Sequence, residues 1–208
     1  KGTPKMGTIN WEAEQPLIDE ISSLYEKHKA TTDEAEKKVI YHQIDSISAL
    51  AAQYVAPNEY DKLMASIGGT GTNAYTTNEL TVYENNIPSN ELEPWLQIES
   101  ERFYNDVLRV FHTELETVYE EFNMGQDRDN TKAYKAFMAS LFPTHPYGQQ
   151  TTIGKGEHLK NPSMENIKKY YSTYYVPNNM AICLSVDLDQ DKTIQLIYKY
   201  FGSVPSKI

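Results

Sequence analysis

Four glutamates stand within the first eight residues of "ELETVYEEFNMGQ", residues 114–126. Carboxylates can bind a metal ion or transfer protons, although a run of acids on a helix is more commonly a solvated face. At about 100° per residue, Glu116 and Glu120 fall opposite an apolar stripe formed by positions 111, 115, 118 and 122. Glu114 and Glu121 are seven residues apart and border this stripe, where we expect the helix to meet the core.

The plainest interpretation of Glu114 and Glu121 is pairing with a nearby lysine or tyrosine. A metal site would also need nitrogen ligands, and none of the five histidines stands in an H-E-x-x-H or H-x-x-E-H motif. His112 lies on the same helix but points roughly opposite to Glu121. The other histidines are expected in unrelated places: His28 and His42 at the surface or boundary of a helical region, His145 in a loop where its role is structural, and His158 near a helix start. The chain therefore does not close a zinc site by itself.

Composition limits the classes of partner. The 208 residues carry a formal net charge of −10, which disfavours binding to nucleic acid or to an anionic membrane surface. No stretch approaches the roughly 18 unbroken apolar residues of a membrane span. Cys183 is the lone cysteine, so an internal disulfide is excluded while the compartment stays open. Because the chain begins with Lys-Gly-Thr, we expect it to be a piece of a longer protein.

Hydrophobic periodicity predicts a chain dominated by helices. Residues 10–68 are expected to form an antiparallel helical hairpin, with Thr31 or Thr32 as the second N-cap, and a shorter helix that starts at Pro57. Residues 69–88 are expected to form a pair of short strands. The rest is expected to comprise helices over 89–104, 107–125, 129–142, 163–175 and 189–201, a long loop over 143–162, and a strand over 179–188. Strands scattered among helices favour an α+β fold over a doubly wound parallel sheet.

Four stretches, taken in order, resemble one peptidase family. "KGTPKMGT" resembles the segment that follows the family's H-x-x-E-H helix, and "GTNAYTTNELTVYENNIP" resembles its strand pair. "ELETVYEEFNM" resembles its helix with two glutamates seven apart. "PTHPYGQQTTIGKGEHLKN", followed by "YYSTYYVPNNMAICLSVDL", resembles its downstream loop, helix and strand. The family is that of the insulinase/pitrilysin-type zinc peptidases, inverted zincins related to mitochondrial processing peptidase.

The resemblance implies a metallohydrolase domain in which a mainly antiparallel sheet packs with helices. In this chain the domain would lack its N-terminal strands and its motif helix. Residues 1–208 would form an incomplete N-terminal peptidase domain, with the helical hairpin at about 10–68 as an insertion. The sequence departs from the family pattern at Val186-Asp187, where the family often has Gly-Asp, and we expect only a local adjustment there.

The resemblance also implies roles for two glutamates. Glu121 matches the family's zinc-binding glutamate, and Glu114 matches the supporting glutamate one heptad earlier. The two histidine ligands and the general base that activates a zinc-bound water would lie just upstream of Lys1. This chain alone would then carry no catalytic residue, be inactive and hold no zinc stably, whereas its parent would bind Zn²⁺.

Asn73, Ala74 and Tyr75 match the family's edge strand, which binds an extended peptide substrate by strand addition. The alternative is an ordinary strand with Tyr75 packed in the core. The parent is expected to be a zinc metalloendopeptidase that hydrolyses peptides or unfolded segments, together with a C-terminal homologous half or a partner subunit. The alternative function is that of a non-catalytic member that binds or scaffolds an active subunit. The pattern suggests a bacterial protein of the periplasm or cell envelope.

Overall fold

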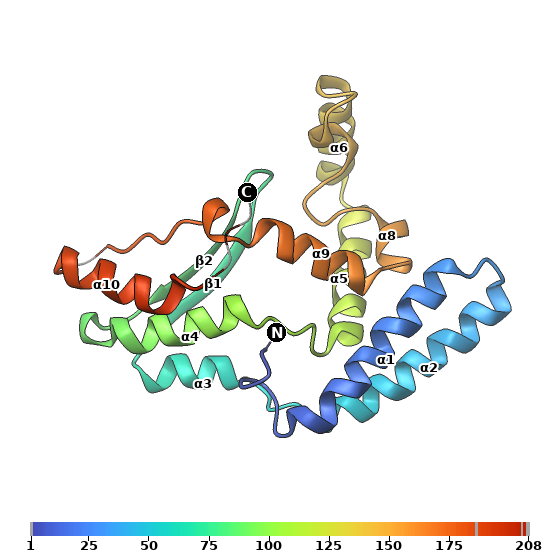
Figure 1. The fold of residues 1–208 in the computed structure, drawn as a ribbon. Coiled ribbons are helices and arrows are strands. Elements are labelled where there is room, and N and C mark those ends of the chain that lie inside the picture. The colour runs from blue at the N-terminus through green and yellow to red at the C-terminus, as the bar shows by residue number, and fades with distance from the viewer. Residues whose placement is uncertain (1, 186, 205, 207–208) are drawn as a thin grey trace.

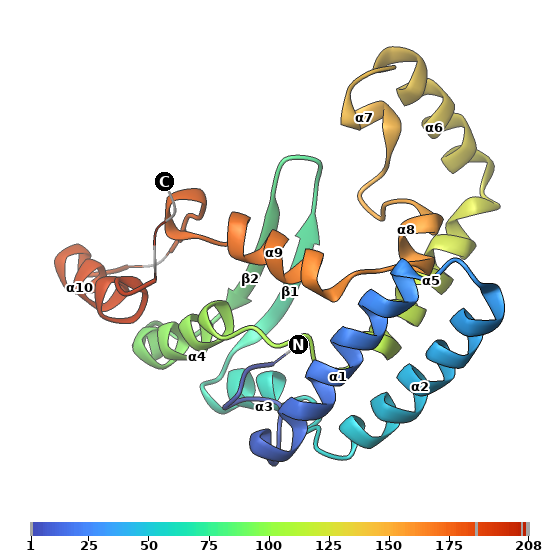
Figure 2. The ribbon, with the colours of Figure 1, turned by 45° about the vertical axis from the view of Figure 1, so that its right-hand side comes forward.

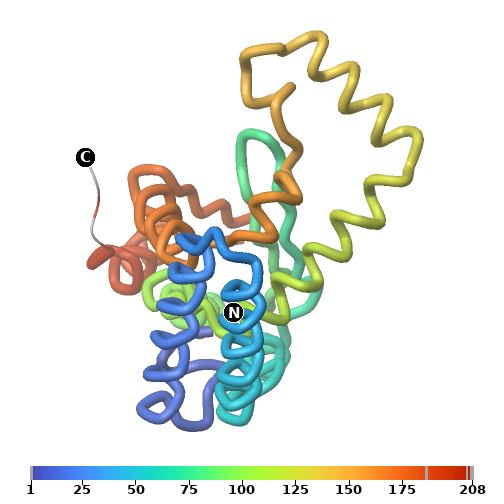
Figure 3. The backbone as a smooth tube through the Cα atoms, turned by 90° about the vertical axis from the view of Figure 1, so that its right-hand side faces the viewer, coloured from blue at the N-terminus to red at the C-terminus, as the bar shows by residue number. Residues whose placement is uncertain are grey.

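The first part of the chain forms the predicted helical hairpin. Its two helices, α1 (Trp11–Ala30) and α2 (Glu34–Ala52), run side by side (Figures 1 and 3). The side chain of Asp33 caps α2 by accepting hydrogen bonds from the amides of Ala35 and Glu36, so the N-cap lies just after the predicted threonines. The third helix, α3 (Glu59–Ser66), starts later than Pro57, because Asn58 takes the N-cap position in a left-handed conformation.

The β-hairpin also forms where it is predicted. β1 (Thr70–Thr76) pairs antiparallel with β2 (Thr81–Asn86). The turn is closed by Thr77, whose hydroxyl accepts hydrogen bonds from the amides of Glu79 and Leu80. An irregularity near the start of β1 coincides with Gly71, whose φ of 59° suits a residue without a side chain.

The remaining elements are helices that follow the β-hairpin in the sequence. In chain order they are η1 (Ser89–Glu91), α4 (Leu92–Tyr104), α5 (Phe111–Gln126), α6 (Asp129–Leu141), α7 (Pro146–Gln149), α8 (Gly156–Lys160), α9 (Met164–Tyr174), η2 (Pro177–Asn179) and α10 (Gln190–Phe201). α6 and α7 form an arm that extends away from the rest of the molecule (Figures 1 and 2). α10 packs on α4, where Lys199 pairs with Glu93 at 2.7 Å.

The predicted α+β fold with an antiparallel sheet is confirmed in outline by the structure, a computed structural model that describes residues 2–185, 187–204 and 206, but the sheet is small. Within this part, the single sheet has two strands, so the fold is a mostly helical α+β domain. The strand predicted over 179–188 does not form, although the backbone is not helical over residues 180–185. A strand needs a hydrogen-bonded neighbour, and the described residues supply none there; Val186 lies outside them.

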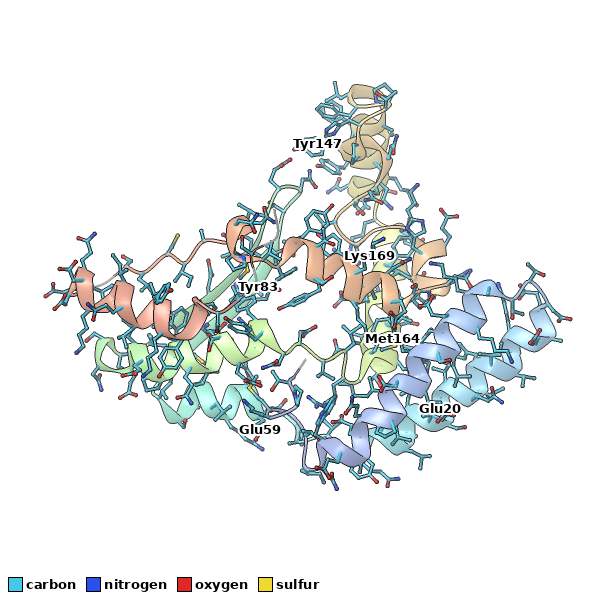
Figure 4. The ribbon with its side chains drawn as sticks, in the orientation of Figure 1. Glu20, Glu59, Tyr83, Tyr147, Met164 and Lys169 are labelled. Carbon is cyan, nitrogen blue, oxygen red and sulfur yellow. The ribbon has the colours of Figure 1, made fainter. Side chains whose placement is uncertain are left out.

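The main core lies between the hairpin and α5. Its buried side chains come from α1, α2, the segment before α5 and the start of α9: Ile18, Ile21, Tyr25, Ile40, Ile44, Ala51, Val107 and Met164. Met164 is labelled in Figure 4 at the meeting point of these helices. No helix of the described residues is long and apolar enough to cross a membrane.

Candidate functional site

The start of α5 is set by a buried arginine. The sequence predicts one helix from residue 107, but the chain is irregular before Phe111. The Arg109 side chain turns inward, where it pairs with Glu14 and donates to the carbonyl of Met6. Val110 then adopts a left-handed conformation with φ 51°. A buried charge must be paired, so this contact fixes the break and with it the direction of α5.

One side of α5 packs against the helical hairpin. The Tyr25 hydroxyl lies 2.7 Å from Nδ1 of His112, which is 5% exposed. The Tyr41 hydroxyl donates to Oε1 of Glu116 at 3.1 Å. Desolvation and the neighbouring Glu116 raise the pKa of Tyr41 to about 12, so this hydroxyl is a neutral donor at physiological pH. Glu116 therefore contacts the helical hairpin, whereas the sequence predicts that its carboxylate faces water.

Glu114 and Glu121 lie on the other side of α5. At about 100° per residue they point roughly 140–180° away from His112 and Glu116. Both side chains are exposed, as is Glu120, and no hydrogen bond or ion pair joins either carboxylate to another described residue. The apolar stripe that they border is half-buried, and its residues Phe111 and Leu115 pack against the main core. The helical hairpin thus covers the face of α5 opposite to the candidate metal ligand.

The structure leaves the candidate substrate strand open. Asn73, Ala74 and Tyr75 are all exposed, and the alternative in which Tyr75 packs in a core is wrong because its exposed fraction is 46%. Among the described residues β1 pairs only with β2, so its second edge presents backbone groups to solvent. Such an edge has the geometry to accept an extended peptide as an added strand.

Aromatic and charged side chains connect β2 with neighbouring residues of the helical part of the chain. The hydroxyls of Tyr83 and Tyr175 lie 3.1 Å apart, and Figure 4 shows Tyr83 between the β-hairpin and α4. The Arg102 guanidinium lies 4.7 Å from the centre of the Tyr83 ring and pairs with buried Glu99. The sequence alone does not reveal this cluster, because an acid and an arginine three residues apart are common on helices and carry no specific signal.

The segment over 143–162 is predicted as a long loop, but it contains the short helices α7 and α8, and His145 has a structural contact in it. Nδ1 of His145 accepts a hydrogen bond from the amide of Tyr147 at 3.3 Å and caps the short helix α7. Gly148 packs so closely that an added Cβ would lie 2.2 Å from the carbonyl oxygen of Phe142. Figure 4 places Tyr147 on the arm formed by α6 and α7.

Zinc, the metal implied by the resemblance, would need several donor side chains close together. Across residues 2–185, 187–204 and 206, no three histidine, cysteine, aspartate or glutamate side chains come together as a metal site. Glu121 offers one carboxylate, and a zinc site needs three or four protein ligands. These residues do not fit a complete zinc site.

Comparisons with known proteins show that the chain is similar to zinc proteases. A family model described as the peptidase M16 inactive domain matches residues 163–208. The chain is 27% identical over 190 residues to the zinc protease PqqE of Helicobacter pylori, which covers 90% of this chain and 42% of that protein. It is 28% identical over 163 residues to the insulin-degrading enzyme of Mus musculus, which covers 74% of this chain and 16% of the enzyme. These matches confirm the predicted resemblance to the M16, or insulinase/pitrilysin, peptidase family, whose zinc proteases are similar to most of this chain.

Solved structures show the same relationship in the fold. A crystal structure of a protease from Helicobacter pylori aligns with a TM-score of 0.67 at 27% identity, covering 72% of this chain and 37% of that one. The first half of the periplasmic protease PqqL from Escherichia coli shares the fold, with a TM-score of 0.61 at 22% identity over 73% of this chain and 34% of that one. The chain spans less than half the length of these relatives.

Proposed function

We propose that this chain is part of the catalytic half of a zinc-dependent endopeptidase that hydrolyses peptides or unfolded segments. Glu121 supplies one zinc ligand and Glu114 supports it, while the other ligands and the general base come from parts of the parent outside these 208 residues. The observation that carries the proposal is the placement of the helical hairpin on the His112 and Glu116 side of α5. The side with Glu114 and Glu121 is left free for groups that the chain does not contain.

The open edge of β1 supports a second part of the proposal. Asn73, Ala74 and Tyr75 bind an extended peptide through backbone hydrogen bonds, and the contacts of Tyr83 and Arg102 hold β2 in place behind them. The partners of the chain are a peptide substrate and a homologous half or subunit. A periplasmic or envelope location is proposed from the periplasmic protease among its structural neighbours.

The test compares three glutamine variants of the full-length parent. Glu121→Gln keeps the size of the side chain but removes its charge, so we expect loss of zinc and of activity with an intact fold. Glu114→Gln is expected to weaken zinc binding by about 10–100-fold, the usual effect of a group that orients a ligand. Glu120→Gln is the matched control and should change neither property, since this exposed neighbour points about 100° away. The measurements are zinc content and hydrolysis of a quenched peptide.

If the Glu120 variant loses zinc and the Glu121 variant keeps it, the assignment of the two glutamates is wrong. If all three variants keep zinc and full activity, α5 carries no ligand and the metal part of the proposal fails.

A second function, that of a non-catalytic partner of an active subunit, is favoured by one finding. The family model that matches residues 163–208 is that of an inactive domain. The sequence of the parent before Lys1 separates the two functions: an intact H-x-x-E-H motif supports the peptidase, and a motif without its histidines supports the scaffold.

A further inference from the structure

A basin of about 350 Å³ opens where the helical hairpin meets the end of α8. Figures 1 and 2 show α8 beside the end of the hairpin that carries the α1–α2 connection. Lys37, Lys38 and His42 of α2 line the basin, together with His28 of α1 and Lys160 of α8. This volume is in the range of small-molecule sites and is too small for a folded partner.

The lining is basic, although the whole chain carries a net charge of −10. Three lysines face the basin, and Glu34 is the single acidic residue that lines it. That glutamate lies 3.7 Å from Nζ of Lys37, so it offsets one of the three charges at most. A local excess of positive charge in an acidic protein favours a small anion.

His28 is the feature that distinguishes this basin from a group of surface lysines. The sequence predicts His28 at the surface or boundary of the helical hairpin, but the exposed fraction of its side chain is only 8%. Its Nδ1 is buried and has no hydrogen-bond partner among the described residues. Burial and then the charge of Lys37 lower the pKa of His28. A buried nitrogen without a partner is rare in native proteins and calls for a ligand or a water.

We propose that this basin binds a small phosphate-class oxyanion, held by the charges of Lys37, Lys38 and Lys160 and by a hydrogen bond from His28. Lysine binds phosphate as a mobile point charge, which suits the three flexible side chains around an open site. The bound anion offsets the repulsion between Lys37 and a protonated His28, so binding takes up a proton at this ring. The proposal is independent of the peptidase function, since the basin involves none of the residues assigned to it.

The test uses the full-length parent in a phosphate-free buffer at constant ionic strength, titrated calorimetrically with inorganic phosphate and with pyrophosphate. We expect saturable binding that weakens by at least about fivefold in Lys37→Ala and in Lys160→Ala, the scale of one lost charge contact. Lys169→Ala, an exposed lysine on α9 (Figure 4), is the control and should bind as the parent does. Circular dichroism confirms that each variant is folded.

A second experiment measures how anion binding depends on pH. Sulfate keeps its charge between pH 8 and pH 5.5, so it probes the protein alone, and its binding should tighten as the pH falls. His28→Gln should reduce this pH response, and the double variant His28→Gln, His42→Gln should remove it, while the lysine contacts keep some binding. The proposal is overturned if no oxyanion binds saturably, or if Lys169→Ala weakens binding as much as the basin variants. It is also overturned if only a glutamate-rich peptide binds, because the occupant would then be a polypeptide.

Discussion

Glu14 and Arg109 form a bidentate ion pair in the interior, with Nε to Oε1 at 2.6 Å and Nη2 to Oε2 at 2.9 Å. Both side chains are almost fully buried. Arg109 also donates to the carbonyls of Thr3 and Met6, at 3.1 and 2.9 Å. The pair therefore joins three segments: the N-terminal stretch, α1 of the helical hairpin, and the link that starts α5.

We expect Arg109→Met to destabilise α1 and α5 by about 3–5 kcal/mol, because it leaves the Glu14 carboxylate buried and uncompensated. Hydrogen exchange of the α1 and α5 amides measures the change. The double variant Glu14→Met and Arg109→Met should recover part of the loss, since it removes the orphaned charge. Equal destabilisation by the single and the double variant would mean that the orphaned Glu14 carboxylate is not the source of the loss.

The contact between Tyr25 and His112 should stabilise the docking of the hairpin on α5. Tyr25→Phe removes the hydroxyl and leaves the buried Nδ1 of His112 without its partner, so we expect a loss of about 1–3 kcal/mol in the opening free energy of α1. Tyr198→Phe is the control, because Tyr198 is 76% exposed and should show no change. Unchanged exchange in the Tyr25 variant would contradict a role for this hydroxyl.

The lowered pKa of His28 predicts that stability falls on acidification. Its ordinary value is about 6.5, and burial followed by the Lys37 charge lowers it in the folded state. As the pH drops below about 6.5 the unfolded chain takes up the proton first, so the folded state loses stability. Urea unfolding at pH 7.5 and pH 5, in phosphate-free buffer, should show a smaller drop for His28→Gln. His42→Gln, an exposed histidine of the same hairpin, should keep the full drop.

Peptides with N-methylated backbone amides test the open edge of β1. An added strand binds through alternate backbone groups, so methylation at alternate positions should weaken inhibition of the full-length parent. Methylation at the intervening positions, whose amides point away from β1, should have little effect. A series in which every position is equally sensitive would contradict strand addition at Asn73, Ala74 and Tyr75.

Local sequence signals predicted much of the fold. The helical hairpin, the two strands over 69–88 and the helices α6, α9 and α10 follow from apolar periodicity, caps and turn residues that lie within a few positions of one another. The resemblance of short motifs also predicted the family. The site residues Glu121, Glu114, Asn73, Ala74 and Tyr75 rest on that resemblance, and their roles stay predictions.

Tertiary contacts decided the features that local signals missed. The break before α5 depends on the ion pair between Arg109 and Glu14. The contact of Glu116 with the helical hairpin depends on the Tyr41 hydroxyl of α2. Tyr25 and His112 are 87 residues apart, and the basic basin exists only because α8 lies beside the hairpin. The strand predicted over 179–188 is not formed by the described residues there, because a strand needs a hydrogen-bonded neighbour that its own sequence does not specify. Periodicity is a property of one segment, whereas burial, pairing and charge compensation belong to segments that meet only after folding.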